Sequence, residues 1–75
     1  MEKRLSEMEY EEKGVVKMIE GELREKVAGM GIRVGKKVKM ITKQPMRGPI
    51  VVLVDEARTS LGLGIAKKVI MEVKK

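Results

Sequence analysis

Apolar and polar residues alternate in short runs along most of this chain, which is the spacing expected of β-strands with one buried face. The runs are separated by glycine, proline and charged turn residues. They cover Gly14–Gly21, Lys37–Lys43, Ile50–Val54, Arg58–Leu61 and Lys68–Val73. Because isolated strand pairs are unstable and closure removes exposed edges, the pattern predicts a mainly β fold, a small antiparallel barrel of about five strands.

One segment, Glu22–Met30, has a helical period instead. Its apolar side chains recur at a spacing that places them on one face of a helix. They are Leu23, Val27 and Met30. Gly31 follows at the position where a left-handed residue commonly ends a helix. We therefore expect one short α-helix after the first strand, held by the sheet because so short a helix is unstable alone.

The opening residues, 1–13, are polar and rich in glutamate, and only Leu5 and Met8 are candidates for the core. We expect this lead to be loosely ordered except where those two side chains dock. It has no apolar stretch of the kind that a secretory signal needs. The longest apolar run, Ile50–Val54, is far too short to span a bilayer. At a length of 75 residues, the chain is expected to be a single soluble domain, 1–75, in the cytoplasm.

The chain contains no histidine, no cysteine and a single aromatic residue, Tyr10. Disulfides, zinc fingers, iron–sulfur clusters and haem ligation by these residues are therefore excluded, and so is a histidine or cysteine base or nucleophile. The serines lack a partner base. Gly62 and Gly64 indicate a crowded backbone corner rather than a phosphate loop. These features predict a protein that is not an enzyme.

Oxygen ligands for a metal are concentrated in the glutamates of residues 1–25. Carboxylates alone select poorly among divalent cations, so we expect at most a weak divalent metal site there, and no cofactor. The methionines at apolar positions, Met30, Met40 and Met71, are better explained as core residues than as thioether ligands.

The net charge of +6 is divided unevenly along the chain. Residues 1–25 carry five basic and eight acidic side chains (5 − 8 = −3), whereas residues 26–75 carry twelve basic and three acidic side chains (12 − 3 = +9). A basic surface suits a nucleic acid, an anionic membrane or an acidic protein, or it only keeps a small domain soluble. The scarcity of amide residues beside abundant Lys and Glu is also typical of heat-adapted proteins.

Three glycine-containing segments form a combination that is more specific than any one of them. They are M-G-I-R-V-G at 30–35, Q-P-M-R-G-P-I at 44–50 and T-S-L-G-L-G-I-A at 59–66. Together they resemble the FeoA family, small cytoplasmic proteins of bacterial and archaeal ferrous iron transport. The likeness extends over nearly the whole chain. It departs from the family pattern at Val34, where proline is usual, and at Arg47-Gly48, where Gly-Asp is usual.

The resemblance implies an SH3-like β-barrel without catalytic activity that docks on the large membrane transporter FeoB, on its cytosolic side, and influences ferrous iron uptake. Small SH3-like barrels commonly bind through loops at one rim, so we expect two surfaces to contact this partner. One is the helix with Arg24 and Lys26, and the other is the loop with Lys43, Met46 and Arg47. An exposed Met46 flanked by cations would anchor an acidic partner.

Three other interpretations stay open at this point. A basic barrel of the ribosomal or KOW-like kind would bind nucleic acid, but the single aromatic residue speaks against it because single-strand binders stack bases on aromatic rings. An SH3-like domain of the kind attached to metal-dependent repressors is the second, although the helix-turn-helix of such repressors is missing here. Pairing of copies through the edge of Lys37–Lys43 would give a homo-oligomer, which the lysines oppose.

Overall fold

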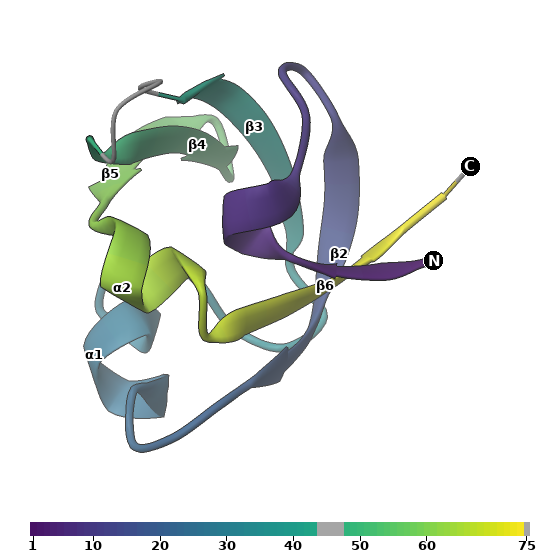
Figure 1. Cartoon of the computed structure of the whole chain (residues 1–75). Helices are drawn as coiled ribbons and strands as arrows, with labels where there is room; N and C mark the ends of the chain where they lie inside the picture. The colour runs from purple at the N-terminus through teal and green to yellow at the C-terminus, as the bar shows by residue number, and fades with distance from the viewer. Residues whose placement is uncertain (44–47, 75) are drawn as a thin grey trace.

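The computed structural model describes residues 1–43 and 48–74, which form six strands and three short helical segments (Figure 1). In chain order these are β1 (Glu2–Arg4), the 3₁₀ turn η1 (Leu5–Glu7), β2 (Lys13–Ile19), α1 (Arg24–Ala28), β3 (Lys37–Lys43), β4 (Ile50–Val54), β5 (Ala57–Leu61), α2 (Leu63–Ala66) and β6 (Val69–Val73). The predicted mainly β, antiparallel fold is confirmed.

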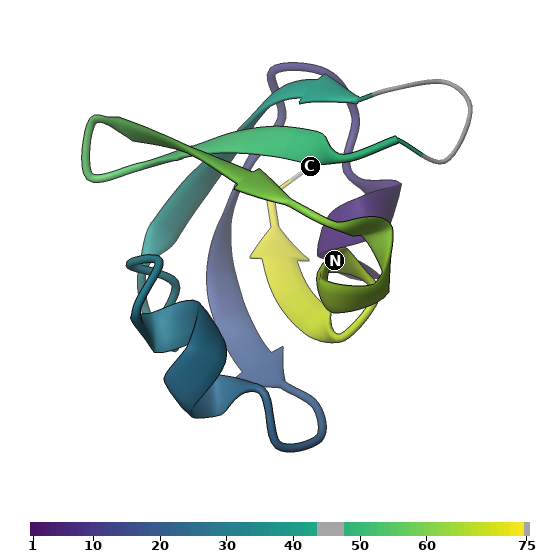
Figure 2. The same cartoon turned by 90° about the vertical axis from the view of Figure 1, so that its left-hand side faces the viewer.

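All the strands belong to one antiparallel sheet in the order β1-β6-β2-β3-β4-β5. The sheet curls around the core (Figure 2), but no ladder joins β1 to β5 within the described residues, so the sheet is not closed. The segments η1 and α2 contact each other beside this opening (Figure 1). The sheet thus has six strands where about five were expected, and it is open between β1 and β5 within the described residues.

The additional strand, β1, lies in the polar lead. It pairs with β6, and Lys3 is the register partner of Met71. Leu5 and Met8, which follow it, are fully buried. The start of the lead, Glu2–Arg4, is thus paired with the sheet. Three consecutive charged residues show no apolar alternation, so this strand forms through backbone pairing with β6, which the sequence pattern does not reveal.

Helix α1 is shorter than the predicted segment Glu22–Met30, spanning Arg24–Ala28. Val27 is fully buried, and the other two residues of the predicted face pack against the core while partly exposed. Gly31 has φ 87°, and the N–H of Ile32 donates to the carbonyl of Val27 at 2.9 Å. The turn that follows the helix therefore closes at Gly31, in the left-handed conformation that the sequence predicted there.

A second helix, α2, stands where a corner was expected at Gly62 and Gly64. The N–H of Ala66 donates to the carbonyl of Gly62 at 3.0 Å, and Ala66 is fully buried. Gly64 within the helix disfavours it in isolation, so the burial of Ala66 stabilises the turn where local propensity does not. None of the helices in the described residues is long and apolar enough to cross a membrane.

The core is apolar and draws on β2 to β6, both α-helices and η1. The methionine prediction is confirmed, because Met40 and Met71 are fully buried and Met30 packs against the core. The β2–β6 register shifts between Val16 and Met18, so Val16 points inward whereas Met18 lies on the outer face with 46% of its surface exposed.

Candidate protein-binding face

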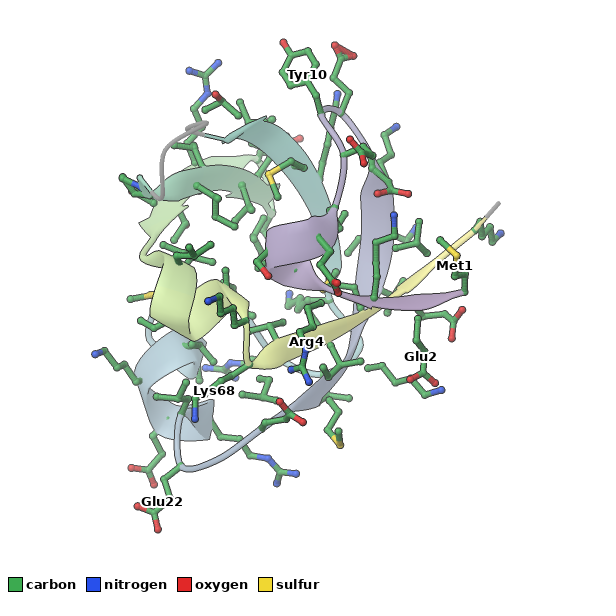
Figure 3. The ribbon with its side chains drawn as sticks, in the orientation of Figure 1. Met1, Glu2, Arg4, Tyr10, Glu22 and Lys68 are labelled. Carbon is green, nitrogen blue, oxygen red and sulfur yellow. The ribbon has the colours of Figure 1, made fainter. Side chains whose placement is uncertain are left out.

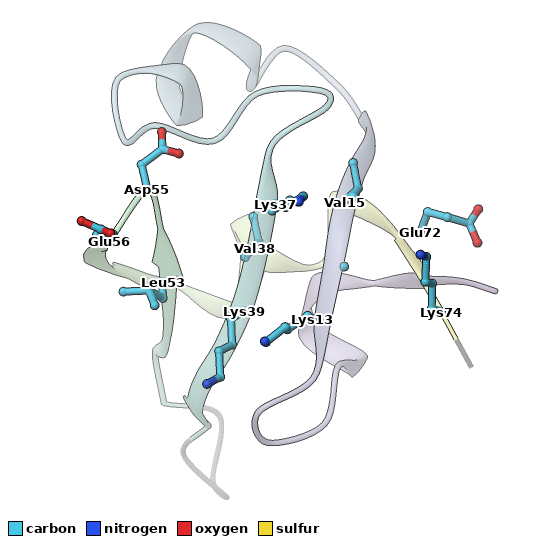
Figure 4. Close-up of a pocket in the computed structure, with 11 residues that line it drawn as sticks. Lys13, Val15, Lys37, Val38, Lys39, Leu53, Asp55, Glu56, Glu72 and Lys74 are labelled. Carbon is cyan, nitrogen blue, oxygen red and sulfur yellow. The ribbon is translucent and has the colours of Figure 1, made fainter.

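A shallow groove of about 540 Å³ lies on the outer face of the sheet, where β2, β3, β4 and β6 run side by side (Figure 4). Val15 of β2 and Leu53 of β4 contribute its apolar surface. Its cations are Lys13, Lys37, Lys39 and Lys74, and its acidic groups are Asp55, Glu56 and Glu72. These four lysines together with Val15 and Leu53 are called the lysine face below.

Strand register brings the lysine face together. Lys13 on β2 is the register partner of Lys39 on β3, and Val15 is the partner of Lys37. Leu53 on β4 is the partner of Lys39 on its other side. Directly opposed residues have Cβ atoms about 5 Å apart. Lys13 and Lys39 therefore occupy neighbouring positions beside an apolar surface, as Figure 4 shows.

Gly14 allows β2 to lie close to β6 beneath this face. A Cβ atom at Gly14 would lie 2.9 Å from the backbone oxygen of Glu72 and 3.1 Å from a methyl carbon of Val73. Both distances are shorter than ordinary van der Waals contact, so only glycine fits without a shift of the backbone. The close approach places Val15 opposite Glu72 in the ladder.

The neighbouring charges are compensated. Lys36 pairs with Asp55 at 2.7 Å, and Lys17 pairs with Glu2 and, at 3.7 Å, with Glu72. By contrast, among the residues that the structure describes, the four lysines of the lysine face have no ion pair and no hydrogen bond to a side chain. The lysine face is therefore a positive region whose charge is not neutralised within the described part of the molecule.

Two of the three acidic groups of the groove, Asp55 and Glu72, have partners of their own. The N-terminal ammonium of Met1 donates a hydrogen bond of 2.6 Å to Glu72, and this bond lowers the pKa of Glu72, with desolvation acting in the opposite direction. The hydrogen bond to Glu2 raises the pKa of Lys17. Figure 3 shows Met1 and Glu2 at the start of β1, beside the end of β6. These groups are exposed, so solvent screens their interactions.

A second hollow, of about 370 Å³, lies beside α1. It is lined by Ile19, Arg24, Ala28, Ile32, Arg33 and Val34. The predicted contact Arg24 is thus placed beside Arg33 and the exposed Val34, and Lys26 is exposed on the same helix.

The other predicted contacts belong to the segment at the end of β3 and just after it. The end of β3 that precedes this segment lies away from α1 (Figure 2). Met46, Arg47 and the side chain of Lys43 lie outside the described residues.

Sequence reasoning did not single out the lysine face. The signal present in the sequence was the alternation in Lys37–Lys43, which placed lysines opposite the face of Val38 and Met40. That alternation alone favours a solvated surface. The pairing of Lys13 with Lys39 depends on the β2–β3 register, which joins residues from distant parts of the chain.

The chemistry that this face offers is binding. Its ammonium groups can donate to anionic oxygens, and its apolar surface can accept a hydrophobic side chain. In residues 1–43 and 48–74, no group of three or more Asp or Glu side chains is placed to hold a metal ion, and every buried side chain is hydrophobic.

The curled sheet, its helical turns and its basic outer face define a small SH3-like β-domain with a surface suited to binding. The family model for the FeoA domain matches residues 3–73, so this chain belongs to the FeoA domain family. No match is found among curated proteins.

Solved structures of FeoA proteins support both fold and family. An iron uptake regulatory protein (FeoA) is 35% identical, with a TM-score of 0.87 and 96% of each chain covered. A FeoA-like protein from Clostridium acetobutylicum is 32% identical, with a TM-score of 0.84, covering 96% of this chain and 86% of that one. FeoA from Stenotrophomonas maltophilia, in complex with zinc, is 25% identical, with a TM-score of 0.80, covering 93% and 89%. That protein is described as an SH3 domain protein and a candidate ferrous iron transport activating factor.

Proposed function

We propose that this protein is a non-catalytic accessory protein of ferrous iron transport, which acts in the cytoplasm by docking on the cytosolic region of a FeoB-like membrane transporter. The observation that carries the proposal is the FeoA domain match over residues 3–73, because it spans nearly the whole chain. The similarity to solved FeoA proteins, one of them described as a candidate transport activating factor, supports the same role.

The physical character of the domain fits a docking role. Its core is apolar, and its charged side chains lie on the surface around a preformed sheet. A rigid face of this kind loses little conformational entropy when a partner binds, which favours recognition. The sequence predicted Arg24, Lys26, Lys43, Met46 and Arg47 as contacts for that partner, and the lysine face is a competing docking surface that contains none of them.

The test uses calorimetry to measure direct binding between the purified chain and the purified cytosolic region of the ferrous iron transporter from the same organism. Saturable binding is expected. In parallel, ferrous iron uptake should fall in cells that lack this chain and recover when it is supplied again. An uptake rate that does not depend on the chain, together with no heat of binding, would contradict the proposal.

A further inference from the structure

The lysine face contains a pair of like charges that the fold itself holds together. Lys13 and Lys39 are direct register partners on adjacent strands. Like charges placed opposite each other in a ladder are destabilising, whereas an opposite pair at the same positions would be stabilising. An anionic group that binds between these two ammonium groups would relieve the repulsion, so the face is better suited to the bound state than to the free one.

The pattern of charge around the face limits what the anion can be. Moving across the sheet, Lys13, Lys39, Leu53 and Arg58 are successive register partners, which makes one row of three cations and one apolar residue. The next row contains Glu72, Val15 and Lys37, so it begins with a carboxylate. The groove therefore combines cations, apolar surface and acidic groups within a short distance.

A uniform polyanion fits this mixture poorly. The phosphates of an RNA strand, or the headgroups of an anionic membrane, would meet Glu72 and Asp55 as well as the lysines. A protein surface can present carboxylates opposite Lys13 and Lys39 and an apolar side chain opposite Val15 and Leu53 at the same time.

We infer that the lysine face is a docking surface for an acidic protein segment that also carries an apolar side chain, with its carboxylates placed between Lys13 and Lys39. The inference rests on the proposed function, in which that segment belongs to the cytosolic region of the transporter. It assigns docking to the outer face of β2, β3 and β4, and not to α1.

The test compares charge-reversal variants of equal net charge in binding to the transporter's cytosolic region. Lys13→Glu and Lys39→Glu should each weaken binding about tenfold, because each replaces an attraction at the interface by a repulsion. Lys67→Glu, at an exposed position outside the groove, makes the same change in net charge and should leave the affinity within about twofold. The wild-type affinity should also fall as salt rises from about 0.1 M to about 1 M.

The same experiment includes a control for correct folding of the variant. Lys13→Glu creates an opposite pair with Lys39, so its thermal unfolding midpoint should be no lower than that of the wild type. Weaker binding by a variant that is at least as stable cannot be ascribed to unfolding, and that combination supports the inference.

Three results would overturn the inference, and they are distinguishable. If Arg24→Glu weakens binding while Lys13→Glu and Lys39→Glu do not, the docking surface is α1 and the proposed function stands. If the wild type binds a single-stranded RNA probe at low salt through Lys13 and Lys39 and does not bind the transporter region, the ligand is a nucleic acid. If the wild type binds neither, the proposed function fails together with the inference.

Discussion

Gly14 determines how closely β2 and β6 approach under the groove. A Cβ atom at this position would stand 2.9 Å from the backbone oxygen of Glu72, and a backbone atom cannot rotate away as a side chain can. The residue therefore sets the position of Lys13 and Val15 on its two sides, and through them the lysine face.

Replacing Gly14 by alanine should destabilise the protein by about 1–3 kcal/mol, because the strands must separate to admit the methyl group. The measurement is chemical denaturation of the variant beside Gly64→Ala. At Gly64 no atom lies within 4 Å of the added Cβ, and alanine favours a helix. Gly64→Ala should thus be neutral or stabilising. Equal stability of the two variants would show that the close approach at Gly14 carries no cost.

Lys13 permits a second prediction at the level of single residues. Exchange of Lys13 for glutamate places a carboxylate opposite Lys39, and an opposite pair in this arrangement contributes about 0.2–1 kcal/mol relative to a neutral pair. Solvent screening keeps the gain at the lower end of that range. Denaturation at low salt should show a small increase in stability that disappears at high salt. A decrease would mean that Lys13 already has a favourable partner.

Among the elements, β1 is short and lies at an edge of the sheet. It is anchored by its ladder to β6 and by ion pairs around it, including Arg4 with Glu20 at 2.7 Å and the N-terminal ammonium of Met1 with Glu72 at 2.6 Å. Figure 3 shows Arg4 beside β6, where its guanidinium also donates to the carbonyl of Lys67. Strand β1, at the start of the polar lead, is thus held to the sheet by both backbone pairing and ion pairs.

The anchoring of β1 should depend on pH in one direction. The hydrogen bond from the N-terminal ammonium lowers the pKa of Glu72 in the folded state below its ordinary value of 4.5. A carboxyl group with a depressed folded-state pKa stabilises the fold above its unfolded-state pKa, and this contribution is lost as the pH falls through the folded-state pKa.

The difference in unfolding midpoint between the wild type and Glu72→Gln should therefore be present at neutral pH, should begin to shrink near pH 4.5, and should vanish once the pH is below the folded-state pKa of Glu72. Thermal unfolding followed over a pH series measures it, and an NMR titration of Glu72 gives the pKa directly. A difference that is constant over the whole series would contradict the assignment. High salt should reduce it, because the groups are exposed.

Sequence alone predicted those elements whose local pattern and final burial agree. β3 and β4 occur at the predicted residues because Val38, Met40 and Val52 enter the core in strict alternation. β1 has no apolar alternation, and α2 contains a helix-breaking glycine, so only tertiary pairing and burial explain them.

The binding face was harder to predict because it is a property of the sheet. Lys13 and Lys39 are ordinary lysines in sequence, and the β2–β3 register makes them neighbours. The resemblance to the FeoA family did predict the fold and the family. Partner contacts lie on exposed side chains that such motifs do not specify.

At the scale of the whole molecule, composition predicts high thermal stability. The chain has few amide residues, no cysteine and 37% charged residues. A composition of this type is common in heat-adapted proteins, in which charge networks gain importance with temperature. The unfolding midpoint should lie above the range of about 45–65 °C that is typical of mesophilic domains. A calorimetric scan that places the unfolding midpoint inside that range would contradict the prediction of high thermal stability.

We propose that this FeoA-family chain acts by docking its outer sheet face on the cytosolic region of a ferrous iron transporter. The most direct test of this proposal is an amide NMR titration of the isotope-labelled chain with that region of the transporter. Saturable shifts or broadening of amide signals are expected to concentrate at Lys13, Val15, Lys37, Lys39 and Leu53, with the signals of α1 little affected. A spectrum that stays unchanged at saturating partner, or changes confined to α1, would contradict the proposal.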